Sequence, residues 1–129
     1  MEMPSLDLLL KEAKNDISAD GCGMYLFHNG VVRKTPKAVV REGASTGMEV
    51  VGMRFSYDAK KVEDAVSRAK SLPGIFYVYA WLNEGELKTG DNLMLVLIGG
   101  DIRPHVVDAL QSLVGELKSE CVVEEEIYG

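Results

Sequence analysis

The sequence predicts a single domain of the α+β class that spans residues 1–129, with the element order α-β-β-β-α-β-β-α-β. Its 129 residues match the size of one domain and suffice to bury a core. Hydrophobic residues make up 47% of the chain and charged residues 26%, as in folded globular proteins and unlike disordered or collagen-like chains. Helical and strand-like periodicities follow one another without an internal repeat, a linker or a low-complexity tract.

The chain opens with a predicted amphipathic helix over residues 5–17. Ser5 is a suitable N-cap, and Gly21 and Gly23 mark the end of the helical pattern. The apolar stripe of this helix consists of Leu6, Leu9, Leu10, Ala13 and Ile17. Residues 23–27 are few, apolar and bounded by glycines, which predicts a buried strand.

Two further strands are predicted before the next helix. Residues 31–41 alternate loosely around Pro36, which favours an edge or irregular strand. Residues 41–47 are small and polar, as in a loop. Over residues 51–57 apolar and other residues alternate, which predicts a strand with one buried face. The residues expected on that face are Val51, Met53, Phe55 and Tyr57.

The second half of the chain predicts two helices and three strands. Asp58 can cap a helix that Pro73 and Gly74 stop. Pro104 suits the first turn of a second helix, over residues 104–118. The apolar stripes are Val62, Ala65, Val66, Ala69 and Leu72 in the first helix, and Val106, Val107, Leu110, Leu113, Val114 and Leu117 in the second. Apolar, β-branched and aromatic runs predict the strands at 75–82, 93–98 and 121–128.

Charge and hydropathy argue against several classes of protein. The chain has 14 Lys and Arg against 20 Asp and Glu, a formal net charge of −6, whereas a nucleic-acid-binding face usually carries an excess of bases. No apolar run approaches the roughly 18–20 residues that a membrane-spanning helix requires. The N-terminus lacks the basic start and the cleavage site of a signal peptide. We therefore expect a cytoplasmic protein that binds neither nucleic acid nor a membrane.

The charged residues are unevenly distributed along the chain. Residues 31–70 hold nine bases and five acids, and residues 71–129 hold three bases and ten acids. A solvated face accounts for such an asymmetry, and a small anionic ligand held by several bases is the alternative. Arg103 can strengthen an anion site at the start of a predicted helix, where free N–H groups favour anions, or it can simply lie in solvent. For Lys118, a favourable interaction with the dipole of the same helix is the simpler interpretation.

The sequence contains no motif for a nucleophile elbow, a phosphate-binding loop or a dinucleotide site. Cys22 and Cys121 are far apart and belong to no CxxC pair, so we expect two buried thiols, with a disulfide or a metal pair as alternatives. His28 and His105 fit ordinary polar positions better than acid–base catalysis. Trp81 and its aromatic neighbours fit a core or an interface better than ligand stacking. We predict no metal site and no cofactor.

Four stretches, taken in their order, resemble the large, catalytic subunit of molybdopterin synthase, the enzyme that builds the dithiolene of the molybdenum cofactor. They are GCGMYLFHNGVVR at 21–33, MRFSYD at 53–58, GELKTGDNLMLVLIGG at 85–100 and IRPHVVDALQSLVGELK at 102–118. The first is similar to a family strand that runs through Phe into Gly-x-Val-Arg, and the third to a Gly-x-Leu-x-x-Gly turn before a strand. The likeness covers about residues 5–128, and the chain is identified as a divergent member of this family.

The resemblance implies a reaction and the residues that carry it. In this family a small ubiquitin-like carrier subunit inserts a C-terminal Gly-Gly thiocarboxylate into a pocket of the large subunit, where it sulfurates a cyclic pterin phosphate. By position, Arg33 and Arg103 are the expected anion-binding arginines and Lys118 the expected catalytic lysine, so we expect the three to converge in one pocket. The family is dimeric, and the apolar strands at 75–82 and 93–98 leave aromatic surface to cover, so we also expect a homodimer.

The sequence departs from the family pattern at several of these positions. Ile102 stands where the family has a histidine, and Ala80 and Trp81 stand where it has a His-Arg pair. Glu124 and Glu125 replace lysines after the final helix, one of which is catalytic in the family. A carboxylate there repels both a phosphate and a thiocarboxylate, so we expect weak sulfur transfer at best.

Two arrangements of these acids are open. Glu124 or Glu125 can face the pocket and neutralise Lys118, or both can point to solvent while Lys34 or Lys37 enters. The alternative function is therefore a catalytically degenerate homologue that binds a pterin-like anion or a carrier tail, as a binding or regulatory module.

Overall fold

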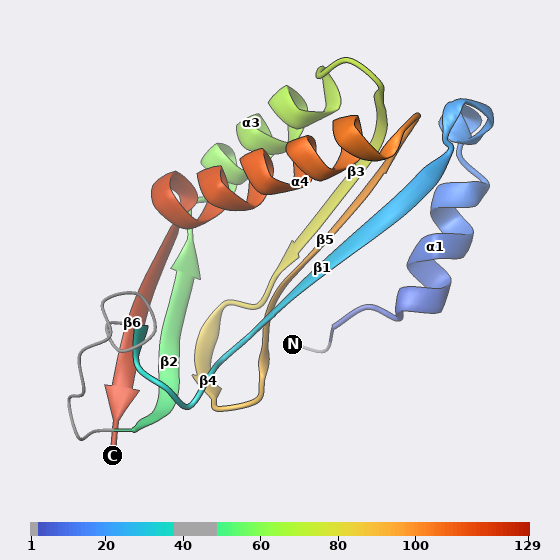
Figure 1. Ribbon diagram of the computed structural model, residues 1–129. Helices are drawn as coiled ribbons and strands as arrows, with labels where there is room; N and C mark the ends of the chain where they lie inside the picture. The colour runs from blue at the N-terminus through green and yellow to red at the C-terminus, as the bar shows by residue number, and fades with distance from the viewer. Residues whose placement is uncertain (1–2, 38–48) are drawn as a thin grey trace.

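The computed structural model describes residues 3–37 and 49–129, and within them two three-stranded antiparallel sheets combine with helices in an α+β fold, as predicted (Figure 1). The first sheet has the order β1-β5-β3 and the second the order β4-β2-β6. The strands are β1 (Met24–Val31), β2 (Val50–Tyr57), β3 (Ile75–Leu82), β4 (Gly85–Lys88), β5 (Asn92–Gly100) and β6 (Val122–Tyr128). The helices are α1 (Leu6–Lys14), α3 (Ala59–Lys70) and α4 (Arg103–Glu116).

Strand β5 lies at the centre of the first sheet and is buried on both faces. Residues 93–98 are at most 4% exposed. Met94, Val96 and Ile98 belong to the main core, which includes residues of α3 and α4, whereas Leu95 and Leu97 pack in a second core with residues of α1. Figure 1 shows α3 and α4 on one side of this sheet and α1 on the other. A strand covered by helices on both faces requires a continuous apolar run instead of alternation, which explains the sequence of β5.

The second sheet is built around β2, which pairs with β4 and β6. The predicted alternation of β2 holds for Met53 and Phe55, which are 6% and 2% exposed. It fails for Val51, which is 49% exposed, because a β-bulge lies between Val50 and Gly52. The bulge adds one residue to β2 opposite β6, so Val50 takes the buried position and Val51 turns outward.

Helix α1 is shorter than predicted. Ser5 caps it as expected, accepting a hydrogen bond from the Leu8 N–H at 3.3 Å. The helix ends at Lys14, and Asp16 then caps a separate 3₁₀ turn over Ile17–Gly21. Ile17 is therefore 98% exposed instead of lying on the apolar stripe, because the change from α to 3₁₀ geometry breaks the spacing of the stripe.

Helix α3 begins where the sequence predicts. The Asp58 carboxylate accepts hydrogen bonds from the N–H groups of Lys60 and Lys61 at 3.0 and 3.1 Å. The helix ends at Lys70, so Leu72 lies beyond its last turn and is 40% exposed, contrary to the predicted stripe.

Two strand predictions change. Strand β1 runs through Gly30 to Val31, and residues 32–37 form no strand of their own, so the predicted strand at 31–41 is absent from its described part. Residues 38–41 of that strand and the predicted loop at 41–47 lie outside the described residues. The segment after β3 contains the short strand β4, which the sequence presented only as a turn. In the described chain two strands therefore precede α3 and three follow it before α4.

Gly52 tests the packing of the second sheet. A Cβ atom at this position would lie 2.5 Å from the Leu87 carbonyl oxygen, a backbone atom that cannot move without disturbing β4. We expect Gly52→Ala to lower the free energy of unfolding by about 1–3 kcal/mol. As a control, Gly115 lies in α4 with no atom near its Cβ position, so Gly115→Ala should raise that free energy by about 0.5–1 kcal/mol. Urea denaturation measures both, and a stabilising Gly52→Ala would contradict this packing.

Candidate functional site

A narrow pocket of about 80 Å³ lies at the junction of the two sheets. The end of β1, the segment after it, β2, the start of β5, the turn after α4 and β6 all contribute to its wall. The lining residues are Val31, Arg33, Lys37, Met53, Leu93, Lys118, Glu124 and Glu126. Three bases and two acids from distant parts of the sequence therefore line one small pocket together with three apolar residues.

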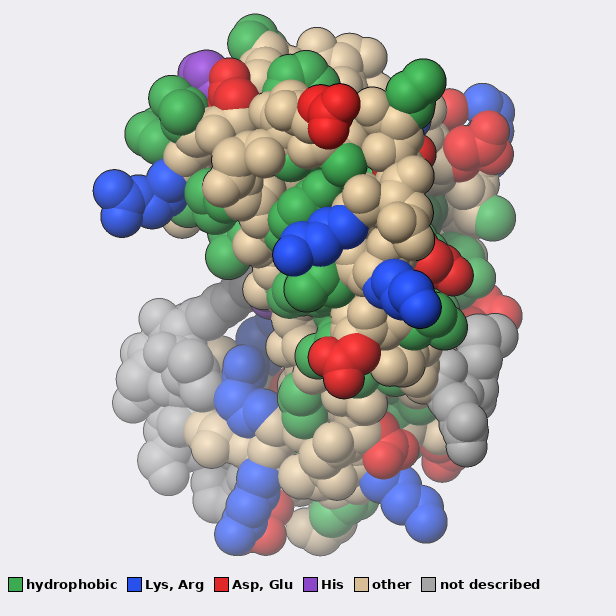
Figure 2. Space-filling model, turned by 90° about the vertical axis from the view of Figure 1, so that its right-hand side faces the viewer, with side chains coloured by type: hydrophobic (Ala, Val, Ile, Leu, Met, Phe, Trp, Pro, Cys, Tyr) green, Lys and Arg blue, Asp and Glu red, His purple; other side chains and the backbone are tan. Residues whose placement is uncertain are grey.

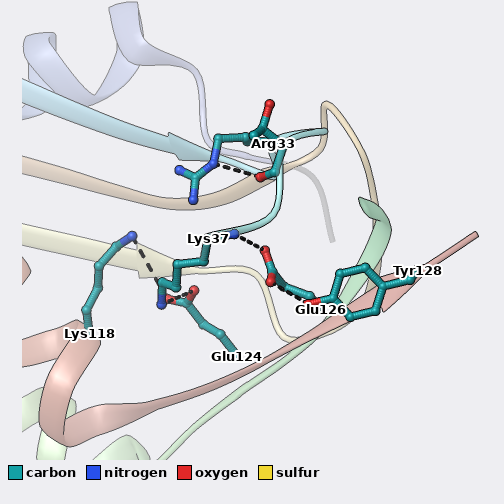
Figure 3. A network of polar contacts seen from close by, with 7 residues as sticks. Arg33, Lys37, Lys118, Glu124, Glu126 and Tyr128 are labelled. Atoms are coloured by element: carbon teal, nitrogen blue, oxygen red, sulfur yellow. Dashed lines mark hydrogen bonds and ion pairs between the residues drawn. The ribbon is translucent and has the colours of Figure 1, made fainter. Parts of the chain in front are cut away.

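Glu124 lies between two lysines at this pocket (Figure 3). Its Oε2 atom is 3.4 Å from Lys37 Nζ and its Oε1 atom is 3.9 Å from Lys118 Nζ. The Glu124 side chain is only 9% exposed, and Oε1 has no hydrogen-bond partner among the described residues. A buried carboxylate is costly unless cations stand near it, so the two ammonium groups explain why this acid can remain inside.

The pairing of β6 with β2 determines which acids of β6 point into the pocket. In its register with β2, Glu124 faces Phe55 and Glu126 faces Met53, both of which point into the core. Glu125 faces Arg54 on the other side of the sheet, and these two side chains form an exposed ion pair at 3.0 Å. Glu124 therefore faces the pocket beside Lys118, as in the first predicted arrangement, whereas Glu125 points away from the pocket, as in the second.

Glu126 fastens the segment that carries Lys37. Its Oε2 atom accepts a hydrogen bond from the Lys37 backbone N–H at 3.0 Å, and its Oε1 atom accepts one from the Tyr128 hydroxyl at 2.9 Å. Lys37 is thus the one of the two lysines proposed from the sequence, Lys34 and Lys37, that enters the pocket. Lys34, the other, lies at the surface in an ion pair with Glu49 at 3.3 Å.

Lys118 owes its place to the turn between α4 and β6. This turn, Leu117–Cys121, is a single turn of π-helix whose first and last residues are buried, which anchors the backbone on both sides of the lysine. The Lys118 side chain is one-third exposed, so its ammonium group borders the pocket and solvent together. Burial raises the pKa of the Cys121 thiol, which fits a structural role for that residue.

Arg33 lines the pocket with an exposed side chain. Its Nε atom donates a hydrogen bond to the Thr35 carbonyl oxygen at 3.0 Å, which fixes the direction of the guanidinium group. The terminal nitrogen atoms of the guanidinium group form no hydrogen bond or ion pair with the described residues. They can therefore donate hydrogen bonds to an anion from outside the chain.

Arg103 lies elsewhere, so the expected convergence of Arg33, Arg103 and Lys118 in one pocket does not occur in this chain. It is the first residue of α4, whereas Lys118 follows the end of that helix. Fourteen residues of helix separate the two ends by roughly 20 Å, at about 1.5 Å per residue. Arg33 and Lys118 share a pocket, and the same chain does not bring Arg103 to it.

His28 lies close enough to Lys118 to feel its charge but does not line the pocket, and the sequence placed it among the ordinary polar positions. It lies on β1, and its Nε2 atom is buried without a hydrogen-bond partner among the described residues. Burial lowers the pKa of His28, and the nearby positive charge of Lys118 lowers it further. The unfolded chain therefore binds a proton at His28 at higher pH than the folded chain does, so acidification through about pH 6.5 should lower the free energy of unfolding.

The remaining candidates take structural positions. Cys22 and Cys121 are free thiols. Trp81 packs in the core beneath α1. His105 Nδ1 lies 2.8 Å from Asp101 Oδ1, and this hydrogen bond lowers the pKa of the Asp101 carboxyl group. In residues 3–37 and 49–129 no group of three or more His, Cys, Asp or Glu is placed to hold a metal ion, and no helix is long and apolar enough to cross a membrane.

Other surfaces offer less to an anion. A wider groove of about 630 Å³ beside β4 is lined by the acids Glu84, Glu86 and Asp91 and by no described base. Figure 2 shows the face on the side of α1, where acidic and basic side chains are interspersed instead of forming a patch of one sign. A further cavity of about 260 Å³ beside α3 has two bases, Lys61 and Arg68, against three acids, whereas the narrow pocket has three bases against two acids.

The model of the MoaE protein family matches residues 5–120. Molybdopterin synthase from Staphylococcus aureus is 16% identical with a TM-score of 0.77, covering 100% of this chain and 88% of that one. The molybdopterin biosynthesis MoaE protein from Burkholderia ambifaria is 16% identical with a TM-score of 0.73, covering 99% and 84%.

A further solved structure contains two different subunits. It is the complex of subunits 1 and 2 of the molybdopterin-converting factor from Helicobacter pylori, 16% identical with a TM-score of 0.66, covering 95% of this chain and 78% of that chain. No curated protein matches this chain in sequence. At these identities the solved structures establish a shared fold.

The pKa of His28 tests the position of Lys118. Replacing Lys118 by Met removes a positive charge that disfavours protonation of the imidazole, so the pKa of His28 should rise toward its ordinary value. A pH titration followed by NMR of the histidine ring protons measures this shift. Lys60→Met provides the control, because Lys60 pairs with Asp64 on the surface of α3. An unchanged His28 pKa in the Lys118 variant would show that the two groups lie farther apart.

Proposed function

The chain belongs to the MoaE protein family, and on this premise we propose that it serves in molybdopterin biosynthesis as the large subunit of a synthase. Its partner in this proposal is a small ubiquitin-like sulfur-carrier subunit, whose C-terminal Gly-Gly tail enters the pocket at Lys118. The observation that carries the proposal is the convergence of Arg33, Lys37 and Lys118 on one narrow cavity.

The size of the pocket favours a slender anionic chain end. A volume of about 80 Å³ corresponds to roughly two or three water molecules, which admits a terminal glycine carboxylate or thiocarboxylate and excludes a pterin ring. The pterin phosphate would therefore remain at the mouth, where the free nitrogen atoms of Arg33 are available to bind phosphate.

Lys118 has the position expected of the catalytic lysine in this proposal. Its ammonium group borders both the pocket and its mouth, so it can stabilise negative charge where the new carbon–sulfur bond forms. Lys37 supplies a second positive charge to the pocket. This lysine compensates in part for the acids that β6 contributes.

A second candidate function is supported by one specific observation. Glu124 approaches Lys118 within 3.9 Å and so offsets the charge of the proposed catalytic lysine in the free protein. A homologue that binds a carrier tail or a pterin-like anion without turning it over would have such a neutralised site. Product formation distinguishes this binding module from a synthase subunit.

Any role of Arg103 in the site requires a second copy of the chain. Within one chain α4 keeps Arg103 roughly 20 Å from Lys118, so Arg103 could reach a pocket only from another protomer. We therefore propose a homodimer in which Arg103 of each protomer completes the anion site of its partner. In a two-fold dimer the same contact would occur twice.

Turnover with purified components tests the proposed reaction. The protein is mixed with thiocarboxylated carrier and cyclic pterin phosphate, and the dithiolene product is measured. We expect Lys118→Ala to lower the rate by about 10²- to 10³-fold, as for loss of one group that stabilises charge in a transition state. Lys60→Ala, which removes an exposed lysine of α3, should retain the native rate. A native protein that binds the carrier and yields no product would instead support the binding module.

Mixing of variants tests the shared site. Light scattering should give the mass of a dimer, and Arg103→Ala and Lys118→Ala should each be nearly inactive alone. After unfolding and refolding together, about a quarter of the native activity should return, because half of the dimers are mixed and each of these has one intact site. A monomer at micromolar concentration, or no recovery in a mixture that forms mixed dimers, would contradict the proposed sharing.

A further inference from the structure

We propose that Glu124 is a tethered anion that occupies the ligand position between Lys37 and Lys118 and is exchanged for the anionic end of an incoming chain. This inference rests on the proposed function, because it concerns the same pocket, and it adds a residue that determines which ligand charge is accepted. It concerns the free protein, in which the carboxylate already contacts both ammonium groups.

The contacts of Glu124 are suited to exchange. Its two distances to lysine nitrogens, 3.4 and 3.9 Å, exceed the roughly 2.7–2.9 Å of a strong charge-assisted hydrogen bond. Its Oε1 atom has no hydrogen-bond partner among the described residues, although the side chain is nine-tenths buried. The carboxylate thus accepts one long hydrogen bond, from Lys37 Nζ to Oε2, and none at Oε1. A ligand that offers the lysines better geometry can replace it.

The neighbouring Glu126 shows the contrast. Both of its carboxylate oxygens accept hydrogen bonds of about 3 Å, from the Lys37 N–H and the Tyr128 hydroxyl. Glu126 therefore stays in place and continues to hold the backbone of Lys37 when Glu124 moves. Of the two acids in the pocket, the structure leaves only Glu124 with the freedom to withdraw.

Exchange sets the charge of the preferred ligand. Three bases and two carboxylates line the pocket, which leaves one net positive charge. When a singly charged chain end takes the place of Glu124, the pocket keeps that balance, whereas a doubly charged phosphate would bring an additional negative charge into a partly buried site. The pocket therefore selects a carboxylate- or thiocarboxylate-ended chain, and a phosphate group is left at the mouth.

Neutralising Glu124 without changing its shape tests the exchange. The probes are two synthetic peptides ending in Gly-Gly, one with a free carboxylate and one with a carboxamide, and binding is measured by calorimetry. We expect Glu124→Gln to bind the carboxylate-ended peptide about tenfold more tightly than the native protein, because the competing charge is gone. Binding of the carboxamide-ended peptide should change little.

Glu125→Gln is the matched control, because Glu125 is the next residue on β6 and pairs with Arg54 on the opposite face. It removes the same charge from the same strand and should leave both affinities unchanged. Equal tightening in both Gln variants would overturn the proposal, since a long-range charge effect would then account for it. Equal or weaker carboxylate binding by Glu124→Gln would also overturn it, and melting temperatures of all variants show whether the fold is intact.

Inorganic phosphate separates this inference from the proposed function. If no peptide binds, yet Glu124→Gln binds phosphate more tightly than the native protein and Glu125→Gln does not, Glu124 competes with anions, but the selection of a chain end is overturned and the carrier-tail function fails. If the native protein forms dithiolene product and Glu124→Gln binds the peptide no more tightly, the function stands and the exchange fails. A Glu124→Gln variant that binds neither phosphate nor peptide overturns the exchange as well.

Discussion

Antiparallel pairing between β2 and β6 determines which charges enter the pocket, because residues that face each other across the two strands share one side of the sheet. Met53 and Phe55 are held inward by the main core, so their partners Glu126 and Glu124 must turn inward as well. A slip of one residue would carry Glu125 into the pocket and place the other two acids in solvent. The hydrophobic core of β2 thus indirectly sets the electrostatics of the site.

The inward acids in turn require bases from elsewhere in the chain. Lys37 comes from the segment after β1 and Lys118 from the π-helical turn after α4, and both approach the carboxylate of Glu124 (Figure 3). The free energy cost of burying that carboxylate falls because two cations stand near it. Arg33 lies outside this mutual arrangement, with its terminal nitrogens left to bind a ligand.

The fold could be predicted from the sequence wherever one periodicity dominates a segment. Strand β3 at 75–82 and the Asp58 cap of α3 agree with the structure because local pattern and tertiary packing favour the same geometry. The bulge that turns Val51 outward and the short strand β4 depend on pairing with distant strands, which no local pattern encodes.

The site was predictable to a similar extent. The family resemblance pointed to Arg33 and Lys118, and both residues line one pocket. Choosing between Glu124 and Glu125, or between Lys37 and Lys34, requires the register of β6 and the path of the chain after β1. The resemblance also pointed to Arg103, which lies at the opposite end of α4 from Lys118, because likeness of motifs gives no information on how far apart two residues lie in space.

The glutamates of β6 have a further consequence outside the pocket. In the described part of the chain β6 lies at the edge of its sheet, where unpaired backbone groups can recruit a strand from another molecule. Glu125 is the exposed carboxylate among the three glutamates of this strand, and a charge there disfavours pairing with another strand, as gatekeeper residues do beside aggregation-prone segments. The charge of the pocket and the resistance of the sheet edge to pairing therefore both depend on the residues 124–126, so a substitution that alters one property can alter the other.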